Sequence, residues 1–209
     1  MKHTDGFGIW LSIGFIAALA VDILIFSVLG VNQAGISSAV VWAARVSFLF
    51  FWLTYAGGAI QPLFGLILGT TTNHSRGFGL GFAGALIIHL CGVVWLFLVS
   101  QQQPISNAGI VYFGIGALWA FTLVLCSGRR FQALLSPGLR RILSFVGLEY
   151  IAFLFLLDFV IGPLRSGHSY PLGYVPFATL ILAALMLRWG TKTWRWIHSL
   201  RRDLPYGAV

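Results

Sequence analysis

Residues 77–99 read GFGLGFAGALIIHLCGVVWLFLV, and this stretch decides the fold class. It contains no Asp, Glu, Lys or Arg, and it exceeds the roughly 20 apolar residues that cross the ~30 Å hydrocarbon core of a bilayer. Because backbone polar groups in lipid must bond to one another, a segment of this kind is a helix. The stretch therefore predicts a transmembrane helix.

Similar apolar stretches recur along the whole chain. We predict an all-α integral membrane protein, a single six-helix bundle over residues 1–209, with spans at residues 8–30, 38–61, 77–99, 108–127, 142–161 and 174–187. The second helix is expected to continue beyond Pro62 as a short interfacial piece. Only 9% of the residues are charged, whereas a soluble domain carries about 25%. The alternating pattern of a membrane β-barrel is also absent. The composition therefore excludes a water-soluble domain.

The basic residues predict the orientation. With six spans, one side of the membrane holds both termini and the connections at residues 62–76 and 128–141. That side receives every Lys and Arg except Arg45 and Arg165. The positive-inside rule then places both termini in the cytoplasm, in a bacterial inner membrane. Residues 18–20 (ALA) resemble a signal-peptide cleavage site, but more apolar residues follow, so we expect an uncleaved first helix.

The net charge of +8 does not indicate a nucleic-acid-binding protein, because the cations lie at helix ends. Residues 188–209 mix cations with tryptophans, which is typical of a tail in the headgroup layer, bound to anionic lipids. Docking of a protein partner is the alternative for this tail. Cys91 and Cys126 are expected near opposite ends of their helices, so no disulfide is predicted.

Ionisable side chains inside a bilayer are costly and mark candidate sites. Five fall inside the predicted spans: Asp22, Arg45, His89, Glu149 and Asp158. Asp22, Arg45 and Asp158 are expected in the outer half of the membrane. An ion pair between Asp22 and Arg45 would relieve two desolvation costs. A path for ions or protons is the alternative.

Two carboxylates share the fifth predicted span. Glu149 and Asp158 are nine residues apart, so a regular helix places them on opposite faces and they cannot act as a pair. Glu149 is expected in the cytoplasmic third, within reach of Arg140 and Arg141. A proton relay is the alternative role for Glu149.

His89 is expected near the midplane of the third span. Gly77 and Gly81 on the same helix permit close approach of another helix or of a flat macrocycle. The pattern alone leaves three roles open for His89: a hydrogen-bonded core residue, a proton carrier or a haem ligand.

Three stretches resemble known motifs. They are WAAR at 42–45 followed by QPL at 61–63, RGFGL at 76–80 with His89 thirteen residues after Arg76, and LVLCS at 123–127 followed by LRRI at 139–142. In this order they resemble the ferric-reductase-like transmembrane superfamily, six-helix proteins that bind haem b. The closest resemblance is to the stand-alone membrane subunit of the bacterial methionine-sulfoxide-repair system. About half of the chain is covered.

The resemblance implies an oxidoreductase-type role in electron transport. His89 would ligate a haem b iron, and Arg76 would meet a propionate or a lipid phosphate, since guanidinium suits such anions. Electrons would come from quinone or from a separate protein partner in the membrane or the periplasm. No flavin or nicotinamide site is expected, because GFGLG at 77–81 opens a membrane helix and is not a phosphate-binding loop.

The sequence departs from the family in its fifth span. The family carries histidines there that face the third-span histidine across the haem, whereas residues 142–161 contain none. His74, His168 and His198 lie outside the predicted spans. Two hypotheses therefore stand: electron transfer with a redox partner, or a haem-free structural or assembly subunit of a larger membrane complex. A small ion or proton translocator is a third, and no catalytic residue is identified.

Overall fold

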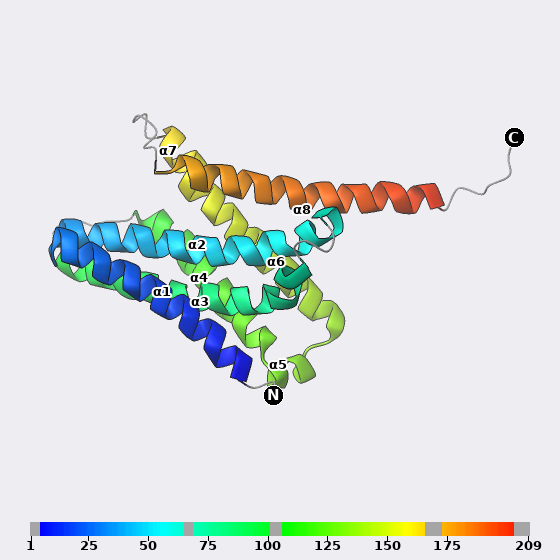
Figure 1. Ribbon diagram of the computed structural model, residues 1–209, viewed down its shortest axis with the longest axis horizontal. Helices are drawn as coiled ribbons and strands as arrows, with labels where there is room; N and C mark the ends of the chain where they lie inside the picture. The colour runs from blue at the N-terminus through cyan, green and yellow to red at the C-terminus, as the bar shows by residue number, and fades with distance from the viewer. Residues whose placement is uncertain (1–4, 65–68, 101–105, 166–172, 203–209) are drawn as a thin grey trace, which may run out of the picture.

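The computed structural model describes residues 5–64, 69–100, 106–165 and 173–202, and every regular element in these ranges is a helix (Figure 1). The elements are α1 (Asp5–Leu29), α2 (Gln33–Phe64), α3 (Gly69–Val99), α4 (Asn107–Ser127), α5 (Arg129–Leu134), α6 (Pro137–Leu156), the π-helical turn η2 (Leu157–Ile161), α7 (Gly162–Arg165) and α8 (Val175–Arg202).

Five of these helices are long and apolar enough to cross a membrane. The spans are Gly8–Leu29, Gln33–Gly57, Arg76–Val99, Asn107–Ser127 and Pro137–Leu164. They correspond to the first five predicted spans, so the all-helical prediction is confirmed and the five apolar helices indicate an integral membrane protein.

The sixth predicted span lies in α8, which differs from the other five. Its apolar part, from Val175 to Leu187, is only about 20 Å long at 1.5 Å per residue. The helix then continues without a break through the basic, tryptophan-rich stretch to Arg202. The predicted helix end at residue 187 is therefore wrong, because α8 continues to Arg202. Residues 203–209 of that tail lie outside the described residues.

Other helix boundaries moved where polar residues suggested breaks. Helix α3 begins at Gly69, eight residues before the predicted start. Its first turns contain Thr, Asn, His and Ser residues, which had suggested a loop. Helix α2 ends at Phe64 with Pro62 inside it, and the rest of the predicted interfacial piece falls outside the described residues. Helix α6 begins at Pro137, because Ser136 is its N-cap and accepts a hydrogen bond from the backbone N–H of Leu139. Serine at the N-cap with proline at the first position is a common helix start.

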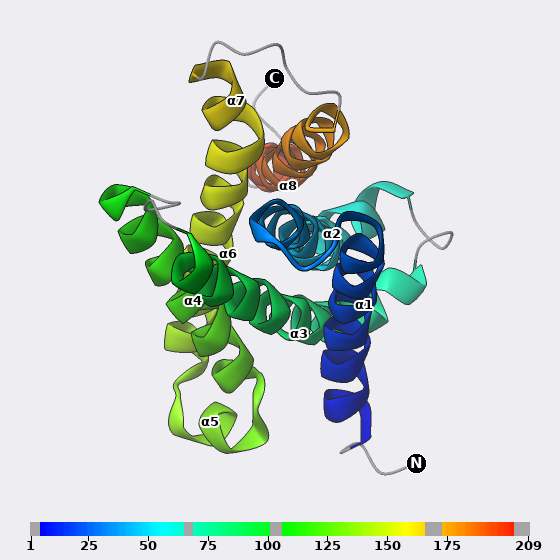
Figure 2. The same cartoon turned by 90° about the vertical axis from the view of Figure 1, so that its left-hand side faces the viewer.

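Helix α2 is the central element. Figure 2 shows it surrounded by α1, α3, α6 and α8, and the packing of α2 against α1, α3 and α8 agrees with this view. Its side chains supply much of the core: Ala39, Ala43, Phe48, Phe51, Tyr55 and Ala56 are all at most 2% exposed.

Helices α1 and α3 pack backbone to backbone. A Cβ atom at Gly14 would overlap the carbonyl of Gly81, and one at Gly84 would overlap the carbonyl of Leu11. The indole of Trp10 covers Gly77. The predicted close approach along the glycines of the third span is therefore confirmed, and its partner is a helix. We call this interface the glycine seam.

Aromatic rings join α2 to α3 and α6. The ring centroids of Phe51 lie 5.5 Å from Phe82 on α3 and 5.2 Å from Phe155 on α6. Phe48 lies 5.0 Å from Phe155 and 4.9 Å from Phe159. Such edge-to-face and tilted pairs fill space densely. These five phenylalanines form what we call the aromatic core.

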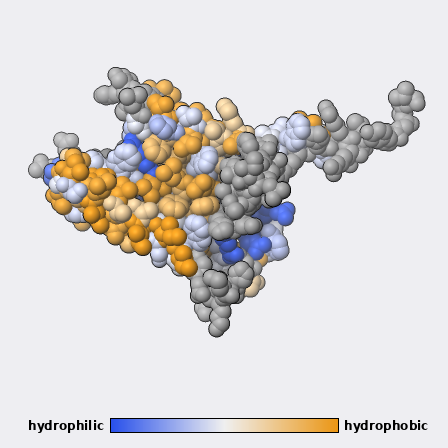
Figure 3. Space-filling model, viewed as in Figure 1, coloured by the Kyte–Doolittle hydropathy of each residue, from blue (hydrophilic) through white to orange (hydrophobic). Residues whose placement is uncertain are grey.

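The two ends of the bundle are unlike. The start of α1, the ends of α2 and α8, and helix α5 lie at one end, which we call the basic end because most Lys and Arg residues fall there (Figure 1). The flank of α1 and α2 is largely hydrophobic in the space-filling view, whereas hydrophilic residues gather near the basic end (Figure 3).

Candidate functional site

The strongest polar interactions join α2, α6 and α8 near the basic end. Glu149 on α6 accepts a hydrogen bond from the hydroxyl of Tyr55 on α2, 2.7 Å from its Oε2. Its Oε1 lies 3.0 Å from Arg188 Nε and 3.5 Å from Lys192 Nζ, both on α8. We call these four residues the charge cluster. Because a paired charge in a bilayer is far less costly than a single one, the cluster explains how Glu149 is tolerated.

The partners of Glu149 differ from the prediction. Glu149 was expected within reach of Arg140 and Arg141, but these lie two to three helical turns away on the same helix, at about 12–14 Å. The cations that do pair come from a stretch interpreted as a surface tail. No spacing rule predicts this pairing, because Glu149 and Arg188 are on different helices.

Aromatic faces complete the charge cluster. The guanidinium carbon of Arg188 lies 4.3 Å from the centroid of the Tyr55 ring. The Lys192 ammonium lies 4.1 Å from the Phe145 ring and 4.4 Å from the Trp189 ring. Cation–π contacts of this kind stabilise the second cation, which one carboxylate cannot neutralise.

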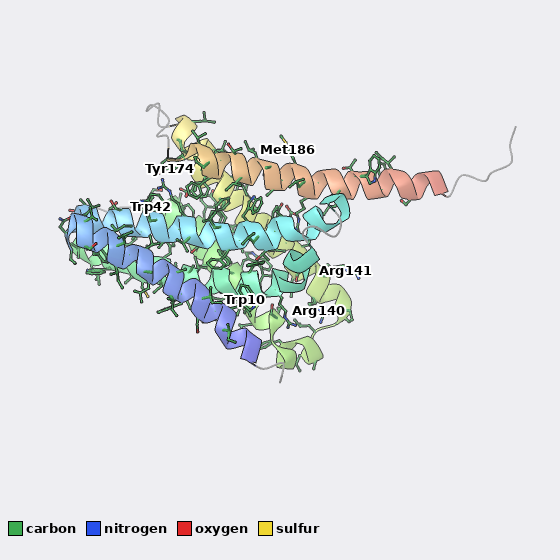
Figure 4. The ribbon with its side chains drawn as sticks, in the orientation of Figure 1. Trp10, Trp42, Arg140, Arg141, Tyr174 and Met186 are labelled. Atoms are coloured by element: carbon green, nitrogen blue, oxygen red, sulfur yellow. The ribbon has the colours of Figure 1, made fainter. Side chains whose placement is uncertain are left out.

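Arg45 occupies a separate aromatic cage. Its guanidinium carbon lies 4.4, 5.3 and 5.2 Å from the rings of Trp42, Tyr174 and Phe177. Figure 4 labels Trp42 and Tyr174 beside each other, where α8 begins next to α2. Arg45 is 8% exposed. The rings supply electrostatic stabilisation that the prediction had assigned to an acidic partner.

The predicted ion pair between Asp22 and Arg45 does not form. Arg45 faces α8, whereas Asp22 lies on α1, which packs against α2 and α3. Oδ1 of Asp22 and Nε of Arg45 are both buried without a hydrogen-bond partner among the described residues. The acid that interacts electrostatically with Arg45 is Asp158.

Glu149 and Asp158 have different neighbours, so they do not form a carboxylate pair, as predicted. The argument for opposite faces assumed a regular α-helix up to residue 161. The π-helical turn Leu157–Ile161 contains Asp158 and changes the rotation per residue. Asp158 interacts electrostatically with Arg45 on α2, the same helix that supplies Tyr55 to Glu149.

His89 lies between α3 and α2. Its Nδ1 is 3.0 Å from the backbone carbonyl of Val40, which makes Nδ1 the protonated ring nitrogen and leaves Nε2 as the acceptor. In the glycine seam Trp10 contacts Gly77 and Gly14 contacts Gly81, so contacting residues of α1 and α3 differ by the same number of positions. The same difference places Asp22 on α1 at the level of His89 on α3. His89 thus makes a hydrogen bond to the backbone at a helix interface.

The residues between α3 and α6 do not fit a haem. In the resembled family the macrocycle lies between the third and fifth spans. Here Phe82 on α3 and Phe155 on α6 face each other with centroids 6.4 Å apart, and Phe51 packs on both. The sequence of α6 contains no His. Helix α6 therefore supplies no second imidazole to face His89.

Arg76 lies on α3 at the basic end. One of its terminal nitrogens donates a hydrogen bond to the carbonyl of Ser127, at the C-terminus of α4. A cation is favoured there by the negative end of the helix dipole. Arg76 also lines two cavities that His89 does not reach.

Metal-binding groups are not found among the described residues, where no three His, Cys, Asp or Glu side chains come together. Cys91 is exposed and Cys126 is buried, and both are free thiols.

Comparison of the chain with protein-family models, with curated proteins and with solved structures gives no match. The resemblance to the ferric-reductase-like superfamily therefore stays a prediction.

The sequence identified the buried charges but missed the aromatic side chains that hold them. Tyr55 and Tyr174 are the clearest cases, since each contacts a cation inside the bundle. A tyrosine in an apolar span was a usable signal, because a buried hydroxyl usually finds a partner. Which partner it finds is not encoded locally.

Proposed function

We propose that this protein is a haem-free subunit of a larger membrane complex. Two observations carry the proposal: α6 contains no His, and Phe51, Phe82 and Phe155 pack against one another between α3 and α6. The charges inside the bundle support it, since Glu149, Arg188 and Lys192 bind one another across helices.

The part of α8 beyond the charge cluster supplies the surface for a partner. It carries Trp194 and Trp196, each 64% exposed, on the turns that follow Lys192. Large exposed aromatic side chains on a rigid helix are typical of interface anchors. We infer that this stretch, in the cytoplasm by the distribution of basic residues, docks the partner of the complex. Headgroup contact is the rival role for the same tryptophans.

An absorption spectrum tests the haem-free part. The full-length protein is produced with an added haem precursor, purified in mild detergent and measured in oxidised and reduced form, together with a His89→Ala variant. We expect no Soret band in either sample. A stoichiometric band in the unaltered protein that His89→Ala abolishes would overturn the proposal in favour of haem-linked electron transfer.

Crosslinking in native membranes tests the partner. We expect one specific crosslinked species for the unaltered protein, lost in Trp196→Ser and retained in Thr193→Ala, an exposed control on the same helix. The tail would be a lipid anchor only, and the subunit role would fail, if the protein stayed uncrosslinked while Trp196→Ser weakened its binding to vesicles.

A further inference from the structure

Two adjoining cavities open at the basic end, between α3, α4 and α6. The outer one has a volume of about 440 Å³ and the inner one about 140 Å³. Both are lined by Arg76, Leu123, Ser127 and Ser144, so they meet at these residues. The outer cavity is additionally lined by Arg140 and Arg141.

The outer cavity is strongly cationic. It combines three guanidinium groups with the hydroxyls of Ser127 and Ser144. Figure 4 labels Arg140 and Arg141 side by side on α6, and Figure 3 shows hydrophilic surface at the same place. Arg76 uses one nitrogen for the Ser127 carbonyl, and guanidinium has further N–H donors to offer.

No acid from the described side chains balances these cations. Glu149 is bound to Arg188 and Lys192, and Asp22 and Asp158 lie toward the other end of the bundle. Within the described part of the chain, the side chains of Arg140 and Arg141 make no hydrogen bond or ion pair, and the two residues are neighbours on α6. An anion from outside the chain is what such a group of arginines binds best, and phosphate matches the geometry of their paired N–H groups.

The inner cavity has the opposite character. It is lined mainly by apolar side chains: Phe51, Leu80, Phe82, Ala120, Val124, Leu148 and Ile151. A cavity of about this volume accommodates an apolar group the size of benzene. A ligand that fills both cavities has a charged head and a hydrocarbon part, with the head at the surface of the membrane. Basic pockets between membrane helices recognise anionic head groups in this way.

We propose that Arg76, Arg140 and Arg141 bind the phosphate of an anionic phospholipid, whose first chain carbons enter the inner cavity. A free phosphate shares the head-group chemistry, but it would leave the apolar cavity without an occupant. The site is independent of the proposed subunit function, because it involves neither the aromatic surface of α8 nor a partner protein.

Lipid retention by the full-length protein tests the site. The protein is exchanged into nanodiscs of phosphatidylcholine containing a minor fraction of phosphatidylglycerol, and the co-purified lipid is quantified by native mass spectrometry after transfer to detergent. We expect preferential retention of phosphatidylglycerol. Replacing two arginines, Arg140→Gln with Arg141→Gln, should weaken it about thirty-fold. The control Arg201→Gln with Arg202→Gln, which removes the same charge from the far end of α8, should change it less than about threefold.

A second variant distinguishes the two sources of phosphate. Val124→Phe fills the inner cavity and leaves the arginines in place. It should weaken retention of phosphatidylglycerol while binding of inorganic phosphate, measured by competition, stays unchanged. The lipid assignment would be overturned if inorganic phosphate displaced the lipid at equal affinity and Val124→Phe did not change retention of phosphatidylglycerol. Retention unaffected by the Arg140/Arg141 variant would overturn the site. Unchanged thermal stability in detergent shows that each variant is folded.

Discussion

The interface of α1 with α3 and the interface of α2 with α6 and α8 are built by different means. At the glycine seam the backbones themselves touch, and no side chain fits between Gly14 and Gly81. Around α2 the contacts are rings and charges, with Glu149 at the centre of one group and Arg45 at the centre of another. Close backbone contact therefore holds α1 against α3, whereas aromatic and charged side chains join α2 to α6 and α8.

The glycine seam should be the most sensitive place. Gly84→Leu puts a side chain into the carbonyl of Leu11, so α1 must move away, and we expect a loss of stability on the order of 3 kcal/mol. Unfolding in SDS measures this loss. Gly114→Leu on α4, where a Cβ meets nothing within 4 Å, is the control and should be neutral or slightly stabilising. Equal losses at both positions would show that the seam is not special.

Variants of the charge cluster should show the next largest loss of stability. Glu149→Gln leaves Arg188 and Lys192 without a negative charge, and we expect about 2 kcal/mol of destabilisation in the same assay. Tyr55→Phe removes one hydrogen bond and should cost about 0.6 kcal/mol, a typical value between membrane helices. A double-mutant cycle of Glu149→Gln with Arg188→Met should show coupling. Strict additivity of the two changes would mean that the pair contributes nothing.

The arginine cage should show a smaller effect. Arg45→Gln removes the charge from three rings and from Asp158, with an expected loss of about 1 kcal/mol. Arg45→Lys keeps the charge and should recover part of the loss. If Gln were as stable as Arg and Lys were the least stable, burial of the charge would dominate over the ring contacts.

Asp22 should give the smallest effect, with the opposite sign. Its Oδ1 has no hydrogen-bond partner among the described residues, so Asp22→Asn relieves a desolvation cost and should be neutral or stabilising by up to about 1 kcal/mol. Equilibrium unfolding again measures it. A clear loss of stability on Asp22→Asn would reveal a functional or structural partner for this acid, and His89 at the same level is the residue to alter next.

The sequence predicted the parts of the fold that local chemistry determines. Runs of apolar residues gave five spans, and the spacing of Gly77 and Gly81 gave the close helix approach, because both depend on neighbours within one segment. The start of α6 was missed because Ser136-Pro137 was interpreted as a break, although it is also a helix cap. The length of α8 was missed because its charges were assigned to a tail.

The candidate site was predicted only as a set of buried ionisable residues. Their partners depend on how three helices meet, and nothing in the spacing of Glu149 and Arg188 indicates that contact. The pairing of Asp22 with Arg45 failed for the same reason, since equal depth in the membrane does not put two side chains on facing surfaces. The π-helical turn at Asp158 was also invisible to an argument based on a constant rotation per residue.

The late start of α8 affects the lipid around the protein. Tyr174, just before the start of α8, contacts Arg45 on α2. Arg45 lies twelve residues after the start of α2, so α2 extends about 18 Å beyond the level at which α8 begins. A bilayer thick enough for α1, α2 and α3 is too thick for the apolar part of α8. Hydrophobic mismatch of this kind is relieved by local thinning of the bilayer. The annular lipids beside α8 should therefore be enriched in short or unsaturated chains. The bilayer should be thinner on the flank formed by α8 than on the flank formed by α1.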